Sequence, residues 1–176
     1  MTTRPNPFLH RQMQHDVWAT EKLIERCRNL TPEQLELTTP GTYGTIRATL
    51  QHIVSSDEGY LVRLTGKVIH EPPFRWNDPA TLDDIATHLG HVKTAIERLF
   101  SGATLDPERL LTDTPLRQPG APRIEMETWV PAAQLIYHGV DHRSQIDTIL
   151  SVHGLETIDL QVWPYAMGLG ASRQVK

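Results

Sequence analysis

Apolar side chains recur every three to four positions along four long stretches of the chain, a spacing that places them on one face of an α-helix. The pattern predicts helices over residues 8–30, 45–64, 81–100 and 131–152. The clearest stripe belongs to the third stretch: Leu82, Ile85, Leu89, Val92, Ile96 and Leu99. Four helices with one apolar face each are typical of a bundle, in which these faces meet.

Capping residues mark several ends of the predicted helices. Residues 31–34 (Thr-Pro-Glu-Gln) have the capping-box pattern with proline at the first helical position, which predicts a short helical turn. Thr81, followed by two acidic residues in the next turn, is expected to cap the third long helix. Pro131 is expected at the first position of the fourth helix, and Gly154 just beyond its end.

Three segments do not follow the pattern of a long helix. Residues 66–79 contain three prolines and two aromatic residues, which predicts an ordered loop that either walls a pocket or packs over one end of the bundle. Within residues 105–130, two alternating runs flank a Pro-Gly turn at 117–122, which predicts a β-hairpin packed on the helices. Residues 156–168 predict one more short helix, interrupted near Pro164.

Composition bounds the class of protein. A chain of 176 residues with 39% hydrophobic and 22% charged residues suits one globular domain over residues 1–176. The net charge of −4 argues against a general nucleic-acid binder, which would carry a basic surface. The single cysteine, Cys27, lies in the apolar stripe of the first helix and is compatible with a reducing compartment. With no apolar signal segment or stretch of membrane-spanning length, we expect a cytoplasmic protein without a membrane partner.

Histidines supply the candidate chemistry. His138 and His142 are four residues apart in the fourth helix, so their rings lie one above the other on its apolar side and can reach one metal ion. A hydrogen-bonded structural pair is the alternative, because buried imidazoles need partners. A third ligand would come from elsewhere in the chain; His52, on a helix face of small residues, is the best candidate, although spacing alone does not select it.

Other histidines remain open as ligands on spacing alone. Spacing alone does not select His52 over His15, His88 or His91 as the third member of the site. His88 and His91, three residues apart, could themselves hold a metal, but they flank the core stripe of their helix and are expected to be solvated surface residues.

Residues 44–53, which include His52, and the downstream motif His138-x-x-x-His142-Arg143-Ser144-Gln145 together resemble the DinB-like family. This is a superfamily of bacterial metal-binding four-helix bundles, and the resemblance extends over nearly the whole chain. It implies an all-α, four-helix bundle of up-down-down-up order with, here, a small β-hairpin insertion. Such an order requires a long connection between the second and third long helices, which residues 66–79 could supply.

The resemblance also implies a divalent metal, with His52, His138 and His142 as its ligands, and a homodimer. Zinc and nickel both suit three imidazoles, and a three-ligand site leaves an open position for water or a thiol. Some family members resemble hydrolases and others transferases or isomerases that use low-molecular-weight thiols. We therefore expect a small-molecule substrate: either that of a metal-dependent hydrolase, or a low-molecular-weight thiol with its acceptor in a thiol-dependent transferase.

Polar neighbours of the three histidines are expected to orient their rings. Gln145, about one turn after His142, and Asp57 or Glu58, after His52, are the candidates, with surface or structural roles as the alternatives. Arg143 is expected at the surface or in a salt bridge, although it could hold an anionic substrate. Tyr43, with Trp76 and Trp163, could line the pocket.

Two other functions compete with the enzyme. A non-catalytic stress-response protein could use the metal as a structural staple, and a fourth protein ligand would favour it, since structural zinc sites are closed. A role on DNA, suggested only by the family's name, is disfavoured by the negative net charge.

Overall fold

The computed structural model describes residues 6–102, 105–113 and 124–173, and every structural statement below concerns these residues. Along the chain they form α1 (Pro7–Cys27), α2 (Pro32–Leu35), α3 (Ile46–Thr65), α4 (Leu82–Ser101), β1 (Leu110–Asp113), β2 (Ile124–Glu127), α5 (Trp129–Val152) and α6 (Val162–Gly168).

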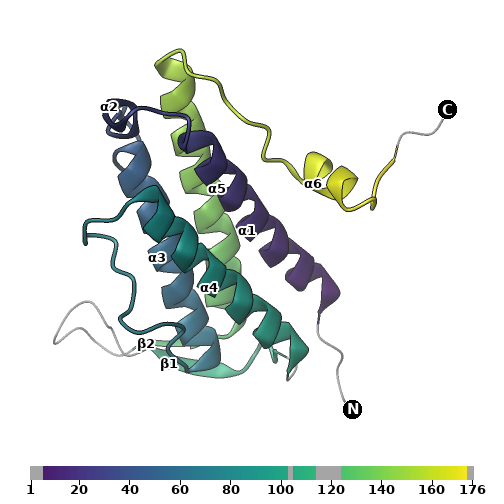
Figure 1. Cartoon of the computed structure of the whole chain (residues 1–176). Helices are drawn as coiled ribbons and strands as arrows, with labels where there is room; N and C mark the ends of the chain where they lie inside the picture. The colour runs from purple at the N-terminus through teal and green to yellow at the C-terminus, as the bar shows by residue number, and fades with distance from the viewer. Residues whose placement is uncertain (1–5, 103–104, 114–123, 174–176) are drawn as a thin grey trace.

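The four long helices form an up-down-down-up bundle (Figure 1). Helices α1 and α5 run in one direction, and α3 and α4 run in the other. The connection 66–81 joins the end of α3 to the start of α4 and returns along the side of the bundle. Helix α3 packs against α4 and α5, and α1 packs against the same two. The predicted fold class is therefore confirmed, including the long second connection.

The predicted apolar stripes form the core. Buried side chains come from all four long helices: Met13, Leu23, Ile46, Leu50, Ile53, Leu61, Ile85, Leu89, Ile96, Leu135, Ile146 and Ile149. Burying one such side chain is worth about 1.5–3 kcal/mol, so the four faces hold the helices together and fix which side of each helix points inward.

Capping accounts for several helix ends. Thr45 accepts a hydrogen bond from the backbone N–H of Ala48 at 3.2 Å, and Thr81 forms the capping box with Asp84 at the start of α4. Gly66 ends α3 with a φ of 68°, a left-handed conformation that glycine adopts without strain. Helix α1 ends at Cys27, three residues before the predicted end, and residues 28–30 form a turn.

Two predictions about prolines are wrong. Helix α5 begins at Trp129, so Pro131 is its third residue, and Thr128 donates its hydroxyl to the Arg109 carbonyl at 2.9 Å instead of capping the helix. Pro164 is likewise the third residue of α6 and does not interrupt it. The N–H groups of a first helical turn have no partner within the helix, so a proline fits anywhere in that turn.

The β-hairpin is confirmed as an antiparallel pair. Its register places Leu110 opposite Glu127 and Asp113 opposite Ile124. The turn predicted at 117–122 lies outside the described residues. Ahead of β1, Arg109 donates to the Leu64 carbonyl at 3.2 Å, which ties the base of the hairpin to the end of α3.

The predicted loop 66–79 is an ordered segment without helix. The Gln51 side chain in α3 donates from Nε2 to the carbonyl oxygens of Arg75 at 2.6 Å and Asp78 at 2.5 Å. These two hydrogen bonds hold the end of the loop against α3, next to the start of α4.

An ion pair is buried between α1 and α5. Arg143 donates to Asp16 Oδ1 at 2.6 Å and to Thr20 Oγ1 at 2.9 Å, and the exposed fractions of Asp16 and Arg143 are 1% and 4%. The salt bridge expected for Arg143 is thus present, but it lies in the interior rather than at the surface. Gly139 makes room for it, because a Cβ there would overlap Asp16 Oδ1 and lie 2.7 Å from the Arg143 guanidinium.

Candidate metal centre

Three histidines converge where α3 packs on α5. His52 comes from α3, and His138 and His142 come from successive turns of α5. One nitrogen of each ring lies within 4.8 Å of the other two. The Nε2 atoms of His52 and His138 are 3.0 Å apart, and the three ring centroids are separated by 4.4 to 4.8 Å. The spacing of His138 and His142 therefore does place both rings at one point, and His52 meets them there.

The geometry of this cluster suits a divalent metal. Zinc–imidazole bonds of 2.0–2.1 Å at tetrahedral angles put ligand nitrogens about 3.3 Å apart, close to the separation of His52 and His138. His142 is 8% exposed, whereas His52 and His138 are half-buried, so solvent reaches one side of the cluster. Neutral imidazoles are ligands that zinc, nickel and other first-row metals accept.

Gln145 holds the ring of His142. Its Oε1 accepts from the backbone N–H of Tyr43 at 2.9 Å and lies 3.2 Å from His142 Nδ1. Because an amide oxygen can only accept, His142 Nδ1 carries the proton and the lone pair is left on Nε2. Gln145 Nε2 in turn donates to Asp141 at 3.1 Å, which fixes the orientation of the amide.

Two tyrosines flank the histidines. The ring of Tyr43 stacks on His52 with centroids 4.0 Å apart and meets the edge of His142 at 5.1 Å. Tyr60 meets His138 edge-on at 5.6 Å. Tyr43 was a sequence candidate for the pocket, whereas Tyr60, one aromatic residue on a long helix, gave no local signal. Trp76 and Trp163 are exposed and have no described ring contact with the cluster.

The two acidic candidates lie elsewhere. Successive residues of a helix are rotated by about 100°, so Asp57 and Glu58 point about 140° and about 120° away from His52, to opposite sides. Asp57 is fully buried near Asp16 and Arg143, and neither of its oxygens has a hydrogen-bond partner among the described residues. Burial first, and then the Asp16 carboxylate, raises the pKa of Asp57 well above its usual value.

Glu58 interacts with α4 and with the loop instead. Its Oε1 is 2.8 Å from His88 Nδ1, and its Oε2 accepts from the backbone N–H of Phe74 at 3.2 Å. His15, another candidate third ligand, binds the Leu160 carbonyl through Nε2 at 2.9 Å. His88 and His91, expected as solvated surface residues, are half-buried and gather with a loop histidine, His70.

These features define a four-helix bundle with a candidate three-histidine metal centre between its second and fourth long helices. The sequence model of the DinB family matches residues 1–167, and the chain belongs to this family. A search of curated proteins finds no match. Among the described helices, none has the length and apolar character needed to span a membrane.

Proposed function

We propose that the protein is a divalent-metal-dependent enzyme whose metal is held by His52, His138 and His142. The observation that supports this most strongly is the 3.0 Å separation of the Nε2 atoms of His52 and His138, with His142 beside them. The hydrogen bond of His142 Nδ1 to Gln145 supports it further, because a second partner on the far nitrogen is the usual way in which proteins orient a metal-binding histidine.

The number of protein ligands favours an enzyme over a structural staple. Within the described residues the cluster consists of three histidines, without a cysteine or carboxylate as fourth member. Structural zinc sites usually have four protein ligands, whereas catalytic sites keep a position open. When bound, the ion would supply a Lewis acid with an open position for water or a thiol.

The residues around the cluster then have separate tasks. Three neutral imidazoles leave the double charge of the ion uncompensated, so the site would attract an anionic group such as a thiolate. Gln145 orients His142, and the ring of Tyr43 covers one face of His52 against water. We therefore propose a hydrolase or a transferase that uses a low-molecular-weight thiol, with zinc or nickel as the metal, acting in the cytoplasm.

A homodimer is the second part of the proposal. Between α1 and α5 lies a groove of about 380 Å³, bordered by apolar side chains that include Phe8, Trp129 and Tyr137. Phe8 and Tyr137 are 81% and 72% exposed. A second copy of the chain would remove these side chains from water. The molar mass from light scattering, compared between the natural chain and Tyr137→Glu, tests this part separately.

Metal content tests the ligand set. Chelator-treated protein is reloaded with zinc or nickel, desalted and measured by elemental mass spectrometry. We expect His52→Ala/His138→Ala to hold one metal equivalent fewer than the natural chain. His153→Ala, which removes an exposed histidine just after α5, is the matched control and should lose nothing. Equal metal content in the natural chain and the double variant would refute the ligand assignment.

A second experiment separates the enzyme from a structural staple. With Co²⁺ in the site, an added low-molecular-weight thiol that takes the open position should shift the visible absorption bands and add a sulfur-to-metal band in the near ultraviolet. Both changes should be absent in the double variant. If instead the cobalt absorption spectrum does not change when thiols or anions are added, and removal of the metal unfolds the bundle, the metal is structural.

A further inference from the structure

A second group of three histidines lies away from the proposed metal centre. His88 and His91 come from α4, three residues apart, and His70 comes from the loop 66–79. One nitrogen of each lies within 4.8 Å of the other two, and all three side chains are half-buried. They lie on the α4 side of α3, whereas the first cluster lies where α3 meets α5.

Two of these rings are oriented through their Nδ1 atoms. His88 Nδ1 is 2.8 Å from the Glu58 carboxylate, and His70 Nδ1 is 3.2 Å from the carbonyl oxygen of Pro72. Both oxygens are acceptors, so each Nδ1 carries a proton and each lone pair lies on Nε2. A carboxylate or carbonyl behind the ring is the support that metal-binding histidines commonly have.

The third ring has an unsatisfied polar atom. Nδ1 of His91 is inaccessible to solvent and has no hydrogen-bond partner in the described part of the chain. A buried polar atom without a partner is unfavourable, and most such atoms in native proteins are paired or hold an ion. A cation bound through Nδ1 of His91 would remove this deficit.

The rings lie close to, but not yet in, the arrangement of a closed metal site. The rings of His70 and His91 stack with centroids 4.2 Å apart, and Phe74 stacks on His88 at 4.1 Å. Ligand nitrogens of a zinc site are about 3.3 Å apart, so one ring must tilt toward the others to close the site. His70 is the member that can do so, because it belongs to the loop and the other two belong to α4.

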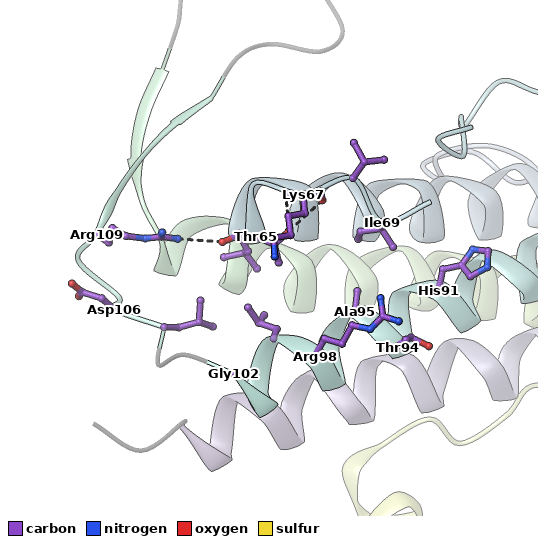
Figure 2. A pocket seen from close by; sticks show the side chains of 14 residues that line it. Thr65, Lys67, Ile69, His91, Thr94, Ala95, Arg98, Gly102, Asp106 and Arg109 are labelled. Carbon is purple, nitrogen blue, oxygen red and sulfur yellow. Dashed lines mark hydrogen bonds between the residues drawn. The ribbon is translucent and has the colours of Figure 1, made fainter. Parts of the chain in front are cut away.

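A cavity of about 670 Å³ adjoins this cluster (Figure 2). His91 lies at one end of it, and Asp106 and Arg109 lie at the other. Lys67 and Arg98 also line it, so basic side chains outnumber acidic ones. The cavity borders His91, and its surplus of basic side chains suits a small anion, which, like water, would complete the coordination of the cation.

We propose that His70, His88 and His91 form a second divalent-cation site, which fastens the loop 66–79 to α4. The site takes a metal that favours imidazole, such as Zn²⁺. Glu58 is a positioning residue that holds the ring of His88 from α3. This site does not depend on the proposed function, because it shares no histidine with the first cluster.

The test uses Zn²⁺ as the probe and the variant His52→Ala/His138→Ala as the background, because the first cluster cannot bind metal in this variant. Isothermal titration of this background should show one equivalent bound. Adding His91→Ala should weaken binding at least tenfold, and adding His153→Ala should not change it. Removing His91 breaks no described hydrogen bond, and far-UV circular dichroism verifies that each variant is folded.

A second readout reports the loop. Trypsin can cut after Lys67 and Arg75, both exposed, and Zn²⁺ should slow these cuts at least threefold in the background protein but not after His91→Ala. The proposal is overturned if the background binds no zinc, or if it binds zinc equally well with and without His91. The single variant His91→Ala, in which the first cluster is intact, should keep the metal bound by His52 and His138. A failure of the second site can therefore be told apart from a failure of the proposed function.

Discussion

Replacement of Arg143 by methionine should destabilise the bundle strongly while leaving its packing volume nearly unchanged. The guanidinium makes hydrogen bonds to Asp16 Oδ1 at 2.6 Å, to Thr20 Oγ1 at 2.9 Å and to the Asp16 carbonyl at 3.3 Å. In Arg143→Met the Asp16 carboxylate, 1% exposed, would remain buried without its cation.

The expected loss in the free energy of unfolding is about 3–5 kcal/mol at pH 7, the range found when one partner of a buried ion pair is removed. Asp57 adds to the effect, because the positive charge of Arg143 also stabilises the ionised form of the buried Asp57 carboxyl group. Total stabilities are about 5–15 kcal/mol, so the variant should unfold at a much lower urea concentration and could be partly unfolded without denaturant.

The loss should shrink in acid. In the natural chain burial raises the pKa of Asp16, although Arg143 lowers it in part. The variant lacks Arg143, so the pKa of Asp16 should be higher still. A carboxyl group whose pKa is higher in the folded than in the unfolded protein favours folding below the unfolded value of 3.8, and this contribution is lost as the pH rises. Near pH 4 the protonated Asp16 needs no cation, so the variant should approach the stability of the natural chain.

Urea unfolding of metal-free protein, followed by far-UV circular dichroism at pH 7 and near pH 4, measures both effects. The control is Asp16→Leu/Arg143→Met, which removes both charges and should recover most of the loss, because an apolar pair often replaces a buried ion pair without penalty. A loss below about 1 kcal/mol at pH 7, or a double variant as unstable as the single one, would refute the reasoning.

Three further predictions concern single side chains. Asp57→Asn should stabilise the protein by about 1–3 kcal/mol at pH 7 and by less near pH 4, because the raised pKa of Asp57 means that its ionised form opposes folding as the pH rises; a gain independent of pH in urea unfolding would contradict this. Cys27, whose pKa burial raises to about 12, should not react with a disulfide reagent at pH 8 until the protein is unfolded, and rapid labelling of the native protein would disprove its burial. Gln145→Leu should weaken metal binding at His142 about 10–100-fold in chelator competition, and an unchanged affinity would show that the amide does not orient the ring.

The helices were predictable because each long one carries a continuous apolar stripe, and those stripes are the core of the structure. The positions of Pro131 and Pro164 within their helices were not predictable, because a proline fits anywhere in a first helical turn. The apolar pattern does not say at which residue that turn begins. The β-hairpin could be predicted from alternation alone, and its pairing agrees.

The site divides in the same way. A spacing of four residues is enough to bring His138 and His142 together, but His52 is 86 residues from His138, and only the resemblance to a family selected it. Glu58 was assigned to His52 from its place on the same helix, whereas its partner His88 comes from another helix. His70 had no local signal, because it lies in an irregular loop. Arg143 misled in a different way: composition favours exposed arginines, while its acidic partner lies 127 residues earlier.

The missing side chain at Gly139 carries an evolutionary consequence. A Cβ at this position would displace the side chain of Asp16 or Arg143, so we expect substitutions at the three positions to depend on one another. In natural relatives, a larger residue at the place of Gly139 should occur only together with the loss of the acid and the arginine, and chains that keep both charges should keep the glycine. An alignment of relatives should therefore show the column of Asp16 changing together with the distant columns of Gly139 and Arg143, whatever metal or substrate each relative has come to use.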